Sequence, residues 1–261
     1  EEGIRISLDT TIERIAVEGG RTTGVVLEDG RHLSADVVVS NMDPVRVYRH
    51  MLPAELPSST AKLRSRYGRL SMGLYVLFFG AKRTWPDVAH HTVWFGERYK
   101  GLLTDIFHKK VLADDFSLYV HRPTATDPSF AAEGCDSFYV LCPVPNLAGG
   151  QDWSVEGPKL RDRIVTALDE TMLPGLSEAI TAEFAMTPED FRDDYLSVDG
   201  AGFSLSPFFS QSAWFRFHNR AEGVDGLYFV GAGTHPGAGL PGVVSSAKVL
   251  DTVVPAPVGA P

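Results

Sequence analysis

Short apolar runs separated by turn residues dominate the first part of the chain. The pairs Gly19-Gly20 and Asp29-Gly30 are turn signals typical of β-hairpins. They separate three predicted strands, at residues 11–17, 22–28 and 31–35. Residues 36–41 carry a continuous run of valines, which is typical of a strand buried on both faces of a parallel sheet. The pattern therefore predicts a β-meander followed by a buried strand.

Proline residues interrupt the pattern that follows. Asp43-Pro44 predicts a helix start, because Asp caps a helix and Pro is tolerated at its first position. That helix is expected to run to about Met51, before Pro53 and Pro57 break the helical spacing. A second helix is predicted over residues 58–66, with a solvated basic face formed by Lys62, Arg64 and Arg66.

Residues 70–143 are rich in β-branched and aromatic residues, which is typical of an antiparallel sheet. Strands are predicted at residues 71–79, 92–95, 117–121 and 137–141, with a short helix near 102–112. On inward faces, apolar side chains of this sheet would wall a cavity or form a plain core: Leu74, Val76, Phe78 and Trp94.

Helical spacing returns after residue 157. A helix over 158–172 is predicted to bury one face, formed by Leu160, Ile164, Ala167, Leu168 and Thr171. Thr187 and Asp190 form a predicted capping box that opens a helix to about Tyr195. The Phe-rich stretch 200–217, which contains Arg216, lacks clear periodicity and would face a ligand or form a packed seam.

The end of the chain reads as strand, glycine-rich loop and helix. Residues 227–230 form a short apolar run, and the glycines that follow indicate positive φ angles or close backbone approach: Gly231, Gly233, Gly237, Gly239 and Gly242. After Pro241, one helical face is predicted to hold Val243, Ala247, Leu250 and Val254.

The start of this last helix is a candidate binding site. Its free N–H groups, predicted at Gly242, Val243 and Val244, would attract an anion or an electron-rich oxygen. Residues 237–242 match GxGxxG, but a loop separates them from the strand and no acidic residue follows at the required distance. This match therefore does not predict the pyrophosphate-binding turn of a dinucleotide fold.

Composition excludes several classes of protein. The net charge of −9 argues against a nucleic-acid partner. The two cysteines form no zinc or redox motif, and no apolar run is long enough to span a membrane. A signal peptide is not recognisable, so we expect a cytoplasmic protein. The chain also lacks an initiator Met.

The histidines do not predict a metal site. Adjacent residues of a strand point to opposite faces, so His90 and His91 are not expected to share one ion. No HExxH or paired-Cys spacing adds support to His108 or His121. Nor does the sequence contain the GxSxG of a nucleophile elbow. We therefore predict no metal ligands and no catalytic side chain.

Four segments resemble the bacterial-type phytoene desaturases and related carotenoid desaturases. They are YFVGAGTHPGAGLPG at 228–242, YVHRPTATDP at 119–128, LCPVPN at 141–146 and QSAWFRFHNR at 211–220. The resemblance implies an α/β (α+β) fold: the C-terminal portion of a two-domain FAD-dependent oxidoreductase. It implies FAD-binding segments at residues 1–52 and 196–261 and an antiparallel substrate domain at 53–195.

The resemblance also implies a function. FAD would accept the hydride during desaturation of a polyisoprenoid such as phytoene. The implied cofactor contacts are Gly231, Ala232, Gly233, Thr234, Pro241, Gly242, Val243 and, near the adenine, Thr11. Because a long polyisoprenoid is dissolved in the bilayer, this substrate implies that the protein associates peripherally with the membrane surface. The chain alone is expected to be inactive. Two alternatives stay open: a flavoprotein that isomerises, saturates or desaturates another isoprenoid, and a non-catalytic lipid-binding fragment.

Overall fold

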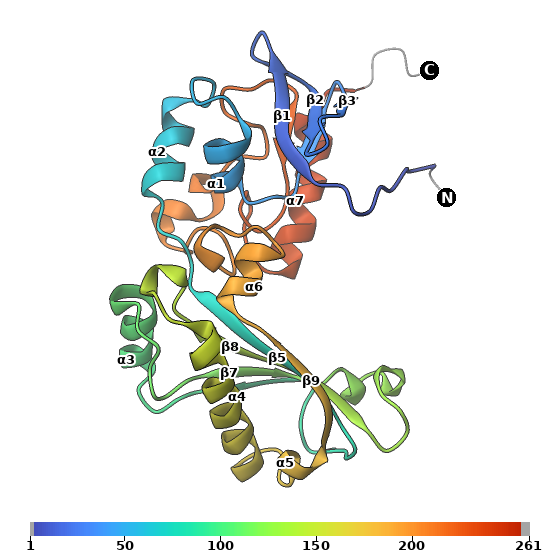
Figure 1. The fold of residues 1–261 in the computed structure, drawn as a ribbon, viewed down its shortest axis with the longest axis vertical. Helices are drawn as coiled ribbons and strands as arrows, with labels where there is room; N and C mark the ends of the chain where they lie inside the picture. Colours follow the sequence, from blue (N-terminus) through green and yellow to red (C-terminus); the bar gives the residue numbers. More distant parts are fainter. Residues whose placement is uncertain (1–2, 257–261) are drawn as a thin grey trace. The chain divides into compact units, whose positions relative to one another are not determined.

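The computed structural model describes residues 3–256 and divides the chain into two compact units (Figure 1). Unit 1 combines Glu1–Leu70 with Phe203–Pro261, and unit 2 is Ser71–Gly202. These breaks fall later than the predicted ones after residues 52 and 195. The first boundary lies after residue 70 because the helix that follows the prolines belongs to unit 1, where Arg64 pairs with Glu222 at 2.7 Å. The second boundary lies after residue 202 because the amide of Gly202 donates to the carbonyl of Met72, a residue of unit 2.

The predicted meander of unit 1 is confirmed. Strands β1 (Ile12–Glu18), β2 (Arg21–Leu27) and β3 (His32–Ser34) form an antiparallel sheet in the order β1-β2-β3. The register shifts between Ala16 and Val17. The extra residue is Thr23 of β2, so β1 keeps its alternation there, and the adjacent residues Ile15 and Ala16 are buried on opposite faces of the strand.

A second, parallel pair joins the two halves of unit 1. Strand β4 (Val38–Ser40) lies beside β10 (Leu227–Phe229), and Val39 is paired with Tyr228. The predicted strand exists, but its burial on both faces is wrong, since Val39 is 46% exposed. Burial of both faces requires cover on each side, and within residues 3–256 this pair has only two strands.

Both predicted helices after β4 are present. Helix α1 (Pro44–Arg46) continues as the π-helical turn η1 (Val47–Met51), and α2 (Ser59–Tyr67) follows. The Asp43 carboxylate caps the first by accepting from the Val45 amide at 2.9 Å. The prediction of a solvated face is wrong for Arg64, which is 17% exposed because it pairs with Glu222.

Unit 2 is built on one antiparallel sheet in the order β6-β7-β8-β5-β9. Its strands are β5 (Gly73–Ala81), β6 (His91–Trp94), β7 (Leu118–His121), β8 (Asp136–Val144) and β9 (Ile180–Met186). The first four were predicted and β9 was not. As an edge strand, β9 is mostly exposed, so its residues lack a strong apolar alternation.

One face of this sheet carries the hydrophobic core of unit 2. Helix α4 (Trp153–Glu170) covers that face (Figure 1) and buries Leu160, Ile164 and Leu168, as its spacing predicted. Alternate residues of β5, such as Tyr75 and Leu77, pack beneath it. The helix begins earlier than predicted, because the Asp152 side chain caps it by accepting from the Ser154 amide.

Shorter elements complete the chain. The capping box at Thr187 is confirmed at the start of α6 (Pro188–Asp193). The other helices are α3 (Tyr99–Thr104), α5 (Leu176–Ala179) and α7 (Leu240–Val253). Single turns are η2 (Asp105–Lys109), η3 (Pro123–Ala125), η4 (Pro128–Phe130), η5 (Leu147–Gly149), η6 (Val198–Gly200), η7 (Phe209–Gln211) and η8 (Ala213–Phe215). Among residues 3–256, every helix is too short or too polar to span a bilayer.

Candidate functional site

The glycine-rich loop of unit 1 connects β10 to α7 and has the backbone that its sequence predicted. Gly231, Gly237 and Gly239 adopt φ angles of +98°, +134° and +95°, which L side chains rarely tolerate. Gly233 has an ordinary φ but lies against α1, where an added Cβ would approach the Pro44 ring to 2.4 Å. The glycines therefore serve both expected purposes: unusual dihedrals and close packing.

A buried arginine holds this loop in place. Arg216 is 2% exposed, and its guanidinium donates hydrogen bonds only to backbone carbonyls among the contacts found in residues 3–256. The acceptors, with donor–acceptor distances, are Ala232 (2.7 Å), Leu205 (3.0 Å), Gln211 (3.3 Å) and Phe203 (2.6 Å). All four acceptors belong to unit 1, so the Arg216 guanidinium packs within that unit.

The charge of Arg216 has a partner nearby. Asp43 caps α1 and also accepts from the Ser204 hydroxyl at 2.9 Å. Burial raises the pKa of Asp43, while hydrogen bonds from Val45 and Ser204 and the charge of Arg216 oppose that rise. Burial likewise lowers the pKa of Arg216, opposed by Asp43. The two groups thus balance each other's charge inside unit 1.

Polar side chains fix the rest of the loop from within. The Thr234 hydroxyl donates to the Phe217 carbonyl at 2.8 Å, and Thr234 is fully buried. The Ser246 hydroxyl of α7 accepts from the Gly231 amide at 2.8 Å. Asn219 donates to the carbonyls of Phe229, His235 and Ser246. In this arrangement Thr234 shapes the loop and does not present its hydroxyl at the surface.

The start of α7 differs from the prediction in one respect. The amide of Val243 donates to the Gly239 carbonyl at 2.9 Å, so the helix begins at Leu240 and this amide is not free. The amides that precede the first intrahelical bond belong to Leu240 and Gly242, since Pro241 has none. The predicted apolar face is also wrong at Ala247, which is exposed, whereas Ser246 is buried.

The surface at the start of α7 is open to solvent. Ala238, Gly239, Leu240 and Pro241 are exposed and offer backbone and apolar atoms. With the helix dipole, amides at a helix start donate to electron-rich oxygens such as ring carbonyls. Residues 230–236 separate the GxGxxG match at 237–242 from β10, which confirms that the match is not a direct strand-to-helix turn.

Thr11, the remaining predicted cofactor residue, lies elsewhere in unit 1. It is exposed and directly precedes β1, and its carbonyl accepts from the Glu28 amide at 3.1 Å. The strand thus positions Thr11 at the end of the meander, outside the group of residues around the glycine loop.

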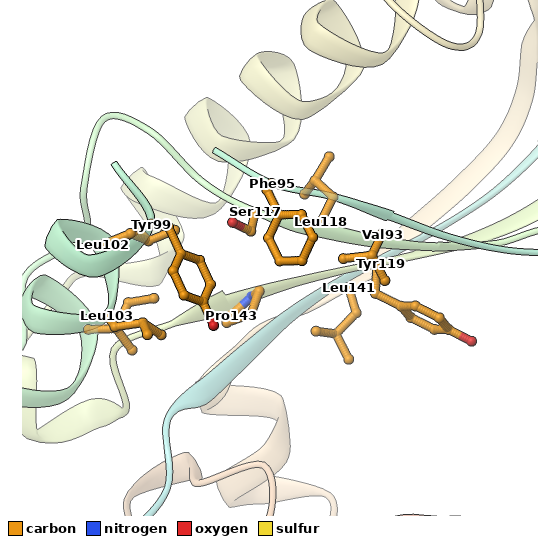
Figure 2. A pocket seen from close by; sticks show the side chains of 11 residues that line it. Val93, Phe95, Tyr99, Leu102, Leu103, Ser117, Leu118, Tyr119, Leu141 and Pro143 are labelled. Carbon is orange, nitrogen blue, oxygen red and sulfur yellow. The ribbon is translucent and has the colours of Figure 1, made fainter. Parts of the chain in front are cut away.

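Unit 2 contains an apolar cavity on the sheet face opposite α4. Its volume is about 200 Å³, and side chains from strands β6 to β8 and from α3 surround it (Figure 2). The lining residues are Val93, Phe95, Tyr99, Leu102, Leu103, Ile106, Ser117, Leu118, Tyr119, Leu141 and Pro143. The Ser117 hydroxyl accepts from the Gly96 amide, so it too has a partner.

The register explains which predicted cavity residues share this face. Leu74, Val76 and Phe78 of β5 pair with Pro143, Leu141 and Tyr139 of β8 and so lie on the cavity side. Phe78 also stacks on Phe184 of β9, with ring centroids 4.5 Å apart. Trp94 pairs with Leu118 and packs toward the core, which was the other alternative for this set of residues.

Most of the cavity lining was missed from the sequence. Tyr99, Leu102 and Leu103 come from a helix that was predicted too late in the chain. Val93 and Tyr119 were within predicted strands, and their alternation with Trp94 and Leu118 was the signal that could have assigned them to one face. The pairing of strands, which decides the matter, is not visible in a single sequence.

The argument against a shared histidine site is wrong. His90 precedes β6 and is not part of it, so strand alternation does not separate it from His91. The ligand nitrogens of His90, His91 and His121 all lie within 4.8 Å of one another. His108, by contrast, lies in η2, outside this group.

Comparison with known proteins identifies the family. Residues 1–249 match the model of the flavin containing amine oxidoreductases. The chain is 50% identical to the neurosporene-forming phytoene desaturase of Rhodobacter capsulatus, over 98% of the chain and 50% of that protein. It is 47% identical to the lycopene-forming phytoene desaturase of Pantoea ananas, over 94% of the chain and 50% of that protein. The chain thus spans about half the length of the curated relatives it matches.

Solved structures agree at the level of the fold. An oxidoreductase from Methanosarcina mazei superposes with a TM-score of 0.59 at 17% identity, over 93% of the chain and 49% of that protein. Putrescine oxidase bound to putrescine superposes with a TM-score of 0.56 at 14% identity, over 94% of the chain and 49% of that protein. The solved structures support the predicted fold class, and the family model supports the predicted cofactor, FAD. Since the family model covers nearly the whole chain, this chain belongs to the flavin-containing amine oxidoreductase family.

Proposed function

We propose that the protein containing this chain is an FAD-dependent desaturase of a carotenoid precursor such as phytoene. The observation that carries the proposal is the apolar cavity of unit 2, whose lining suits an unsubstituted hydrocarbon chain. The family membership and the desaturase names of the relatives support it.

Unit 1 is proposed to hold FAD through the glycine loop and the start of α7. Ala232, Pro241 and Gly242 are not fully buried and contribute direct contacts, as does Thr11 separately. Gly231, Gly233, Thr234 and Val243 contribute through the shape of the loop and helix, because their polar or backbone groups are engaged within unit 1. Bound FAD would supply the hydride acceptor.

The residues of unit 2 have a positioning role in this proposal. Leu141, Pro143 and Val93 would bury a segment of the polyene and exclude water from it. The lining offers no carboxylate, and removal of hydrogen next to a polyene needs little acid–base assistance. We therefore assign no side chain as a catalytic acid or base.

Replacing Val93 by Asp should lower kcat/KM for phytoene by about tenfold or more, since a charge would meet the apolar substrate. Val93 is 56% exposed in the free structure, so stability should change little. The matched control is Val155→Asp on α4, where Val155 is 47% exposed and lies on the helix that covers the other sheet face. Equal activity in both variants of the full-length, FAD-loaded protein would contradict a substrate site here.

The membrane surface is the proposed place where substrate is taken up. Exposed aromatic side chains near η7 and η8 support apolar docking: Phe209 is 85% exposed and Trp214 is 69% exposed. The net charge of −9 disfavours anionic headgroups, and Arg64, one of the basic residues of α2, is already paired with Glu222.

Liposome co-sedimentation of the full-length protein should therefore vary little with salt. Salt weakens attraction between charges, with a screening length of about 10 Å at 0.1 M ionic strength, but does not weaken apolar contacts in this way. Replacing Phe209 and Trp214 together by Ser should reduce the bound fraction at every salt concentration. Phe130→Ser is the control, since Phe130 is 61% exposed but belongs to unit 2. Release of the wild-type protein by moderate salt would reject apolar docking.

A further inference from the structure

Three histidines meet on the sheet face of unit 2 that also carries the apolar cavity. His91 opens β6 and His121 ends β7, and the two residues are directly paired across the strands. His90 precedes β6, and its carbonyl accepts from the Arg122 amide at 2.9 Å, which fixes its backbone beside β7. Sheet register and one backbone hydrogen bond thus place all three imidazoles together.

We propose that His90, His91 and His121 form a binding site for a divalent cation of the zinc type. The Nε2 atoms of His90 and His121 are 2.8 Å apart, and all ligand atoms lie within 4.8 Å. Zinc binds imidazole nitrogen at about 2.0–2.1 Å, which puts two coordinating nitrogens roughly 3 Å apart. Small side-chain rotations are sufficient to reach that geometry, and a water molecule would take the fourth position.

Hydroxyl groups orient two of the three rings. The Thr126 hydroxyl contacts Nδ1 of His90, and the Tyr119 hydroxyl contacts Nδ1 of His91 at 2.7 Å. Since Nδ1 is engaged in each ring, Nε2 is the atom left for a metal. Such outer hydrogen bonds fix the tautomer and orientation of metal-binding histidines. The cluster therefore has supporting partners as well as candidate ligands.

A bound ion would connect β6, which is an edge strand, to β7 and to the turn that carries Thr126. We expect it to stabilise this edge of the sheet, two residues along each strand from Val93 and Tyr119 of the cavity.

The test is equilibrium dialysis of the full chain, stripped with EDTA, against ZnCl2, followed by metal analysis. The wild type should retain one ion per chain, and its thermal midpoint should rise with ZnCl2. His90→Gln, His91→Gln and His121→Gln should each weaken binding by about 100-fold, and Thr126→Val by about tenfold. His108→Gln is the matched control and should bind as the wild type does, because His108 is exposed and outside the cluster.

A spectroscopic measurement keeps the proposal testable if a histidine variant fails to fold. Co²⁺ added to the wild-type chain should give visible absorption bands typical of nitrogen coordination, and ZnCl2 should abolish them by displacement. Absence of those bands, failure to retain zinc, or equal binding by the His121→Gln and wild-type chains would each overturn the site. If His108→Gln lost zinc binding to the same extent as the variants of the cluster, the proposed site would also be overturned.

Discussion

Replacing Arg216 by Met should destabilise the protein by about 3–5 kcal/mol, because buried carbonyls would lose their hydrogen bonds. Met keeps much of the length of Arg but cannot donate to Ala232, Leu205, Gln211 or Phe203. The substitution would also leave the buried Asp43 without its nearby positive charge. Urea denaturation of the full chain would measure the loss.

Arg220→Met is the matched control for this substitution. Arg220 lies four residues later in unit 1 and pairs with Asp225 at 3.0 Å, but both side chains are more than half exposed. An exposed pair of this kind contributes about 0–1 kcal/mol, so the control should remain close to wild type. If Arg216→Met cost no more than Arg220→Met, Arg216 would not be what holds the glycine loop.

Gly233→Ala should destabilise unit 1 by about 3 kcal/mol, the upper part of the range for overpacking in a closed interior. Its φ is ordinary, so the effect would come from the added methyl group alone. The nearest atoms are Cδ of Pro44 at 2.4 Å and Oγ of Ser204 at 3.2 Å. A proline ring at the start of a helix cannot rotate away, so the loop itself must move. FAD content of the full-length protein should fall with the stability.

Two further substitutions separate contact from backbone strain. At Gly239, φ is +95° but a Cβ would meet nothing within 4 Å, so Gly239→Ala should cost about 1–2 kcal/mol from strain alone. At Gly80 of β5, φ is ordinary and the nearest atom is 4.0 Å away, so Gly80→Ala should be neutral or stabilise by about 0.4–1 kcal/mol. A Gly233→Ala variant as stable as Gly80→Ala would refute the close-packing account.

The sequence predicted elements well where a local signal was strong. The glycines at turns predicted the meander, and the capping residues Asp43 and Thr187 predicted two helix starts. The dense glycines after β10 predicted the loop before α7. The edge strand β9 was missed because its exposed residues need no apolar alternation. Helix α4 begins at Trp153 and not at the predicted Pro158, because the Asp152 side chain caps the helix and Pro158 is tolerated within its first turns.

The candidate sites were less predictable, because they depend on contacts between distant residues. Ser246 was not among the residues of the predicted apolar face of the last helix, yet its hydroxyl accepts from the Gly231 amide and lies on the buried face. Arg216 was noticed, but its carbonyl acceptors lie in segments that only the fold brings together. The histidine cluster was rejected by a rule for strands, and the position of His90 just outside β6 made that rule inapplicable.

The central proposal is that this chain serves an FAD-dependent desaturase, and one measurement tests it most directly. Phytoene in liposomes is added without oxygen to the purified full-length protein, and the visible flavin absorbance is followed. The account predicts that the flavin absorbance bleaches in step with the formation of a product that carries one new double bond for each FAD reduced, followed by its ultraviolet absorbance. Val93→Asp should slow both changes, and Val155→Asp should slow neither. Bound FAD that stays oxidised in the presence of phytoene, with no such product, would contradict it.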